Sequence, residues 1–263
     1  MAYHFIQRPN YHNALGGSRL LGVTYYYTNS KFFTHTGIFS ERPYNDQTTG
    51  DSGIVLSGRY LYKPIVNENS TFQIGTSQRF AVINTYKTAS STLAVSSPLE
   101  TNILPSAKKI GAEINILDPK YSYRFGLETM YHNSDFFVRG EYMKTFVNKK
   151  TSGTAEYQSA YVETGYTFNG NYKYDNQKAV LKGLNKAGNV EAVARLSWTD
   201  LYSGTNTNGV SGGVQMRNYT LGANYVINKY AQLMLSYTHT NLTSKTKNDK
   251  NIGMLQARAM FNF

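Results

Sequence analysis

The chain has 263 residues, no cysteine, 13 phenylalanines, 23 tyrosines and a formal net charge of +11. The absence of cysteine excludes disulfide frameworks and thiolate metal sites, and no run of about 18 uncharged apolar residues is present to form a transmembrane helix. The positive charge implies an anionic partner, for which nucleic acid, lipopolysaccharide and the solute of an anion-selective pore are the candidates.

From the N-terminus onward, apolar and polar residues alternate in runs separated by Asn, Asp, Gly, Ser, Lys and Pro. A half-buried strand divides such residues between two faces, whereas a helix scatters them around its surface. The pattern therefore predicts thirteen strands. They lie near residues 18–28, 32–41, 53–64, 71–84, 88–97, 107–117, 122–132, 135–148, 155–168, 189–200, 215–227, 231–242 and 252–263.

The last predicted strand shows the alternation most clearly. One of its faces carries Leu255, Ala257, Ala259, Phe261 and Phe263, and the other carries polar residues and methionine. Transmembrane barrels need this combination of an apolar band toward lipid, aromatic girdles at both interfaces and a polar lumen. We therefore predict an all-β fold, a transmembrane antiparallel β-barrel in the bacterial outer membrane, as a single domain over residues 1–263.

The strand at 88–97 has the weakest pattern and is predicted for a topological reason. Barrel hairpins alternate between short periplasmic turns and longer outer loops. With 88–97 counted as a strand, the turn at 29–31 and the loop at 42–52 keep this alternation, while the long link at 169–188 is an exception. Thirteen is an odd number, and bacterial single-chain barrels have an even number of strands. The first residues also lack an export signal, so we expect the chain to be the C-terminal part of a larger barrel.

A series of segments carries a family resemblance. These are HFIQRP, SRLLGVTY, TGIF, GIVLSGRYLYKPI, FQIGTSQRF, FGLETMYHNSDFFVRGEY, AYVETGYTFNG, NVEAVARLSWTDL and YTLGANYVINKYAQLMLSYTHTN. In order and spacing they resemble the phosphate-selective porin O and P family over nearly the whole chain. The resemblance implies a homotrimer of 16-stranded barrels that passes small anions through a constriction lined by lysine and arginine. At 88–97, where the family tends to carry arginines facing the lumen, this chain has Thr92, Ala94 and Ser96, so we expect a general anion preference.

Strand parity identifies the charged residues expected to face the lumen. The candidate pore-lining and anion-binding residues are Arg59, Lys63, Arg79, Lys109, Arg124, Arg139, Arg195 and Arg258. The acidic residues of the same faces are Glu113, Glu128, Glu141, Glu163 and Glu191. This surplus of positive charge attracts anions in a narrow pore of low dielectric. Alternatively, most of these side chains are neutralised within the wall, with Arg139 close to Glu141 and Arg195 close to Glu191.

Other features indicate partners in the membrane. Tyr25, Tyr26, Tyr27, Tyr60, Tyr62, Tyr225 and Tyr237 fit interfacial girdles, although the core of a soluble sandwich is an alternative. Phe263, which ends a strand with an apolar face, is the expected signal for the outer-membrane barrel-assembly machinery. The basic loop 243–251 is either a lipopolysaccharide contact or a solvated loop, and the glycine-rich loop 201–213 either covers the pore mouth or is mobile.

Catalysis is not expected, because the sequence lacks a G-x-S-x-G elbow, a P-loop and an H-E-x-x-H motif. The five histidines are scattered, so neither a metal site nor a cofactor is predicted. The leading hypothesis is a porin for passive diffusion of small, anionic solutes, with no nucleic-acid partner. A non-conducting outer-membrane barrel, either an adhesin or a hydrolase using His132 or His239, and a soluble β protein with a basic face remain as alternatives.

Overall fold

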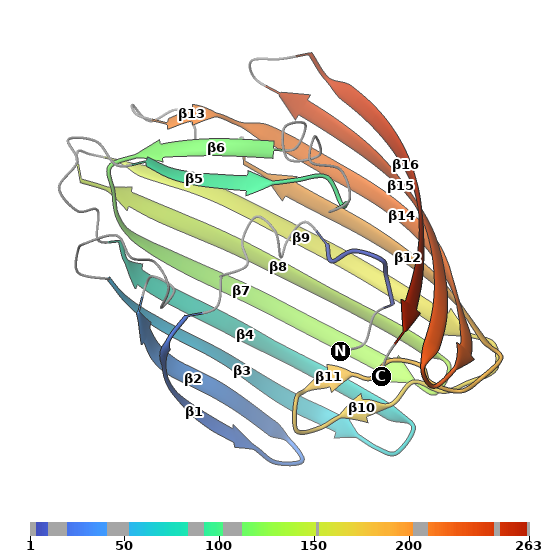
Figure 1. Ribbon diagram of the computed structural model, residues 1–263. Coiled ribbons are helices and arrows are strands. Elements are labelled where there is room, and N and C mark those ends of the chain that lie inside the picture. Colours follow the sequence, from blue (N-terminus) through green and yellow to red (C-terminus); the bar gives the residue numbers. More distant parts are fainter. Residues whose placement is uncertain are drawn as a thin grey trace.

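A computed structural model describes residues 4–9, 20–40, 53–83, 92–101, 112–150, 153–201, 210–244 and 248–261 of the chain. Eleven strands form one antiparallel sheet, in the order β1-β2-β3-β4-β7-β8-β9-β12-β14-β15-β16 (Figure 1). We call this sheet the wall. Its strands are β1 (Gly22–Thr28), β2 (Phe32–Ser40), β3 (Ile54–Val66), β4 (Ser70–Val82), β7 (Pro119–Asn133), β8 (Phe136–Lys149), β9 (Thr154–Thr167), β12 (Asn189–Asp200), β14 (Val214–Asn228), β15 (Ala231–Ser244) and β16 (Lys250–Phe261). Over the described residues, no pairing joins β1 to β16, so the sheet has two open edges.

The two faces of the wall differ as the alternation predicts. The outer face exposes large apolar side chains, with Leu255 at 73 %, Leu221 at 63 % and Leu196 at 53 % of full exposure. The opposite face, which we call the inner face, holds buried polar residues such as Thr220, Asn224 and Ser236. An apolar surface that extends over a whole sheet fits contact with lipid. Within the described ranges, no helix is long and apolar enough to cross a membrane.

The tyrosines of the predicted girdles are all exposed, but Tyr26 does not fit the outer face. Tyr26 lies opposite His35, which in turn lies opposite Arg59 of β3. Its ring packs edge-on against Phe33, and its hydroxyl donates to the carbonyl oxygen of Gln177. Tyr26 therefore takes part in inner-face contacts, so its place in the outer girdle was predicted wrongly.

The strands predicted near 88–97 and 107–117 are present in their described parts, but their predicted place in the barrel wall is wrong. β5 (Thr92–Ser97) and β6 (Ala112–Leu117) pair with each other, and β13 (Val210–Gly212) joins β6 in a separate three-stranded sheet, while β4 pairs directly with β7. Ile114 and Ile116 of β6 are fully buried in a cluster with inner-face side chains such as Met143 of β8 and Tyr157 of β9. The apolar face of this small sheet thus packs against the wall and not against lipid, and alternation with a period of two is the same in both cases.

The strand count falls from thirteen to eleven without disturbing the alternation of turns and loops. That alternation requires an even number of wall strands between residues 84 and 118, and both two and zero satisfy it. The short connections at 29–31, 67–69, 134–135 and 229–230 therefore still fall on one end of the sheet. The whole excursion from β4 to β7 is one long insertion on the other end.

The long link between β9 and β12 contains a small hairpin, β10 (Tyr174–Asp175) and β11 (Val180–Leu181), which covers the inner face of distant strands (Figure 1). Ala179 packs with Phe33 of β2 and Leu61 of β3, and the Tyr174 hydroxyl donates to Oε1 of Gln73 at 2.5 Å. Burial raises the pKa of Tyr174, so its phenol stays neutral and keeps this donor role. The link is long because it covers the sheet as well as connecting two strands.

Candidate functional site: the charged inner face

Seven of the eight candidate residues lie on wall strands with their side chains on the inner face. Arg59 and Lys63 come from β3, Arg79 from β4, Arg124 from β7, Arg139 from β8, Arg195 from β12 and Arg258 from β16. Lys109 lies outside the described residues. Of the acidic candidates, Glu128, Glu141, Glu163 and Glu191 share this face, but Glu113 is an exposed residue of β6. The described part of the wall therefore carries seven basic against four acidic candidates.

Arg139, Glu163 and Arg195 are direct neighbours across β8, β9 and β12. Arg195 Nε donates to Glu163 Oε2 at 2.8 Å, and Arg139 Nε donates to the other oxygen, Oε1. Glu163 is 1 % exposed. One buried carboxylate thus holds two guanidinium groups, and the direct contact of Arg139 is with Glu163. Glu141 accepts a hydrogen bond from Tyr161 instead.

The predicted closeness of Arg195 and Glu191 is not a direct contact either. Glu191 bonds to His4 Nδ1 at 2.6 Å, and it accepts hydrogen bonds from Tyr172 at 2.7 Å and Asn224 at 2.5 Å. His4 belongs to residues 4–9, which lie against the inner face. The Arg195 guanidinium stacks over the ring of Phe5 at 3.8 Å and donates to the carbonyl of Gln7.

Arg59 and Lys63 of β3 are held by contacts of different kinds. Arg59 donates from Nε and Nη2 to the two oxygens of Glu128 at 2.8 and 3.1 Å, a two-pronged pair of the kind that fixes geometry strongly. Lys63 is fully buried, and its Nζ donates to the carbonyl of Asn29 at 2.8 Å and to Oδ1 of Asn176 at 2.5 Å. Lys63 therefore links the β1–β2 turn to the β10–β11 hairpin. Because Lys63 is fully buried, we do not expect it to bind a permeating ion directly.

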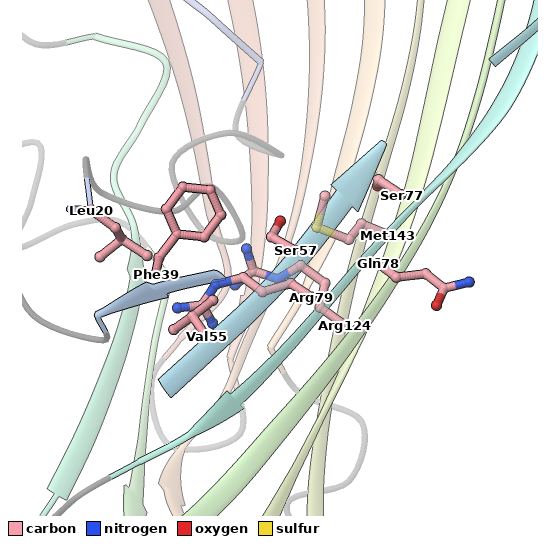
Figure 2. A pocket seen from close by; sticks show the side chains of 9 residues that line it. All are labelled: Leu20, Phe39, Val55, Ser57, Ser77, Gln78, Arg79, Arg124 and Met143. Carbon is pink, nitrogen blue, oxygen red and sulfur yellow. The ribbon is translucent and has the colours of Figure 1, made fainter. Parts of the chain in front are cut away.

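Arg79 and Arg124 form a different arrangement, because they are direct cross-strand partners of like charge. Both line a pocket of about 260 Å³ with Ser57, Ser77 and Met143 (Figure 2). In Figure 2, Arg79 and Arg124 are drawn among the side chains that line the pocket, and Gln78 is directed away from them. Arg124 Nε donates to Thr145 Oγ1 at 3.3 Å. Like charges directly opposite in a sheet are destabilising by a few tenths of a kcal/mol to about 1 kcal/mol.

The carboxylate of Glu100 also lies on the inner face, although the alternation of residues along the predicted strands did not identify it. Glu100 lies in residues 98–101, just after β5, and is 2 % exposed. Its partners Arg195, Ser197 and Thr220 are 95 to 120 residues away in the sequence. No local sequence pattern predicts that Glu100, in the loop Ser-Pro-Leu-Glu, contacts strands so far away in the sequence. The sequence does not predict the role of His4 either, because its partner Glu191 is 187 residues away.

The histidines considered for a hydrolase lie in unrelated surroundings. His132 is buried and stacks on Tyr174 with 6.3 Å between ring centroids. His239 shares the strand parity of the outer-face residues Tyr237 and Leu235. In the part of the chain that the structure describes, no group of three or more His, Asp or Glu side chains is arranged to hold a metal ion.

Comparison with protein families gives one result that covers the chain. The family model described as phosphate-selective porin O and P matches residues 2–263. Comparison with curated proteins gave no significant match. The family match agrees with the antiparallel wall, its apolar outer face and its charged inner face.

Proposed function

Because the chain belongs to the phosphate-selective porin O and P family and is therefore an outer-membrane porin, we propose that it passes small anions by passive diffusion along its inner face. The observation that carries this proposal is the Arg79–Arg124 pair at the pocket between β3, β4 and β7. The described residues that line this pocket include two arginines, two serines and no carboxylate. Serine hydroxyls and guanidinium groups both donate hydrogen bonds to an anion.

Three other arginines of the inner face have a glutamate as direct partner. Arg59, Arg139 and Arg195 each donate to a glutamate, so their charge is balanced and their position fixed. Their field still contributes to the net potential of the inner face. The proposal thus assigns the direct contact to Arg79 and Arg124 and a supporting electrostatic role to the rest.

The test is a single-channel recording in a salt gradient on the Arg79→Gln/Arg124→Gln variant. We expect the wild type to prefer anions and the double variant to lose most of that preference, because two positive charges leave the path. Arg217→Gln is the matched control. Arg217 is exposed on the outer face of β14, where its side chain donates to Gln215. This variant should therefore keep the wild-type selectivity.

Three outcomes count against the proposal. Cation preference of the wild type, or equal selectivity of the double variant and the wild type, would remove the role of the arginine pair. A folded protein without conductance would favour a non-conducting barrel instead. That alternative is supported by one observation, since residues 4–9, residues 98–101 and the β10–β11 hairpin all lie against the inner face and narrow any path.

We further propose three sets of partners for this porin. The first is a second and third copy of the chain in a homotrimer, which the resemblance to the porin O and P family implies. Lys250, with Lys245 and Lys247 outside the described residues, would contact lipopolysaccharide phosphates, and Phe263, also outside them, would engage the barrel-assembly machinery. Crosslinking in native membranes tests the trimer, and Phe263→Ala should reduce the amount of heat-modifiable protein in the outer membrane.

A further inference from the structure

The carboxylate of Glu100 lies among four donors that belong to two neighbouring wall strands. Oε1 accepts from Ser197 Oγ at 2.6 Å and from Asn218 Nδ2 at 3.4 Å. Oε2 accepts from Thr220 Oγ1 at 3.2 Å and lies 3.5 Å from Arg195 Nη1. All five residues are at most 5 % exposed. Each carboxylate oxygen therefore has at least two donors in a site away from solvent.

The donors are fixed by the wall and do not depend on Glu100 for their position. Arg195 pairs with Thr220, and Ser197 pairs with Asn218, in the β12–β14 register. Asn218 Oδ1 accepts from Thr240 at 2.7 Å, which turns its Nδ2 group toward the site. Arg195 is also held by Glu163 at 2.8 Å. The sheet thus preforms a set of donors matched to a planar group with two oxygens.

Glu100, in contrast, comes from outside the wall. It lies in residues 98–101, after the inserted strand β5, and its backbone carbonyl accepts from Gln256 Nε2 of β16 at 3.1 Å. Its carboxylate therefore enters the site as the end of a separate segment. A tethered group of this kind has a high effective concentration, so free anions do not displace it readily.

We propose that β12 and β14 form a carboxylate-binding site whose resident occupant is the tethered side chain of Glu100. In the native chain the site is filled and closed to free anions. When Glu100 is shortened to alanine, each of the four donors loses one buried acceptor, which is unfavourable. Asn218, Thr220 and Arg195 keep a second partner, in Ser197, Thr238 and Gln7 respectively. A small monocarboxylate such as acetate replaces the lost group, because it supplies the same two oxygens in about the same volume. The site is separate from the Arg79–Arg124 pocket and does not depend on ion conduction.

The experiment measures thermal unfolding of the detergent-extracted full chain against acetate concentration at constant ionic strength, with chloride as the balancing anion. We expect Glu100→Ala to gain stability in a saturable way, with half-saturation on the order of millimolar acetate. The wild type and Glu100→Gln should show no saturable response, because a side chain still fills the site. Phosphate and benzoate, which differ in shape and size, should not reproduce the effect of acetate.

A second variant tests whether the wall donors are responsible. Adding Ser197→Ala and Thr220→Val to Glu100→Ala should weaken half-saturation by at least about tenfold. A folded Glu100→Ala protein that responds to acetate no more than Glu100→Gln overturns the proposal. An unchanged response after the two donors are removed overturns it as well, since acetate would then bind elsewhere.

The proposal remains testable if Glu100→Ala does not fold in chloride alone. Recovery of heat-modifiable, folded protein is then measured during refolding at increasing acetate concentration, and acetate-dependent recovery supports the site. Glu100→Ser, which leaves similar space with a polar group, is the companion variant. If neither variant folds or responds at any acetate concentration, the proposal fails, because bound acetate should replace the contacts of the missing carboxylate.

Discussion

Glu163→Gln should destabilise the protein far more than a surface substitution of the same chemistry. Glu163 is 1 % exposed and bonds to both Arg139 and Arg195. Unit charges about 4 Å apart attract by about 4 kcal/mol at an effective dielectric of about 20, and part of this offsets the cost of desolvating the carboxylate. Removing one member of a buried ionic group typically costs about 3–5 kcal/mol, because the remaining charges stay buried without compensation. Since the amide oxygen of glutamine still accepts one hydrogen bond, we expect about 3 kcal/mol.

Glu156→Gln is the matched control on the same strand. Glu156 bonds to Lys144 Nζ at 2.8 Å, but the two side chains are 38 % and 31 % exposed. Exposed ion pairs contribute about 0–1 kcal/mol. Urea unfolding of both variants in detergent micelles, followed by intrinsic tyrosine and tryptophan fluorescence, compares the two free energies of unfolding. If the two variants lose equal stability within about 0.5 kcal/mol, burial does not make the ion pairs of Glu163 stronger than the exposed pair of Glu156 and Lys144.

Four other substitutions probe different parts of the protein. The free-energy losses of Arg139→Gln and Glu163→Gln, measured in the same urea assay, should not add in the double variant, whose loss should be smaller than their sum by about 1 kcal/mol or more. Strict additivity would show that the two residues act independently. Ile114→Ala, at a fully buried position of the inserted sheet, should cost about 2–5 kcal/mol through the cavity it leaves; a loss below about 1 kcal/mol would show that the inserted sheet contributes little to stability. Leu221→Arg, on the outer face at mid-strand of β14, should cost about 2–4 kcal/mol in lipid vesicles, while an unchanged stability there would place this position outside the apolar band. Lys63→Met should free the β10–β11 hairpin from the β1–β2 turn and speed cleavage after Lys178 or Lys182 by trypsin, and cleavage at the wild-type rate would mean that Lys63 does not hold the hairpin.

The sequence predicts the wall well because each wall strand has one face toward lipid and one toward polar surroundings. All eleven wall strands, and the inner-face position of Arg59, Arg79, Arg124, Arg139 and Arg195, follow from counting residues by twos. The same counting fails for β5 and β6, because an inserted sheet with one apolar face has the same alternation. The difference between them is tertiary, since the partner of Ile114 and Ile116 is the wall itself.

The ion pairs were predicted from neighbours on the same strand, and distance explains why this failed. Residues two apart along a strand are separated by nearly 7 Å, whereas directly opposed residues on adjacent strands have Cβ atoms about 4.5–5.5 Å apart. Arg139 therefore bonds to Glu163 across the β8–β9 pair and not to Glu141 on its own strand. Pairings of this kind become predictable only when the register between strands is known.

Register also decides where basic side chains meet one another on the inner face and where they meet carboxylates. In the β8–β9–β12 region, the register places Glu163 between Arg139 and Arg195, and the inserted Glu100 adds a second carboxylate next to Arg195. In the β4–β7 pair, the register places Arg79 opposite Arg124 at the pocket of Figure 2. A shift by two residues in β7 would preserve every inner-facing side chain but would move Arg124 away from Arg79. The location of an anion site in this wall is therefore a property of strand pairing, which neither the composition nor the number of arginines specifies.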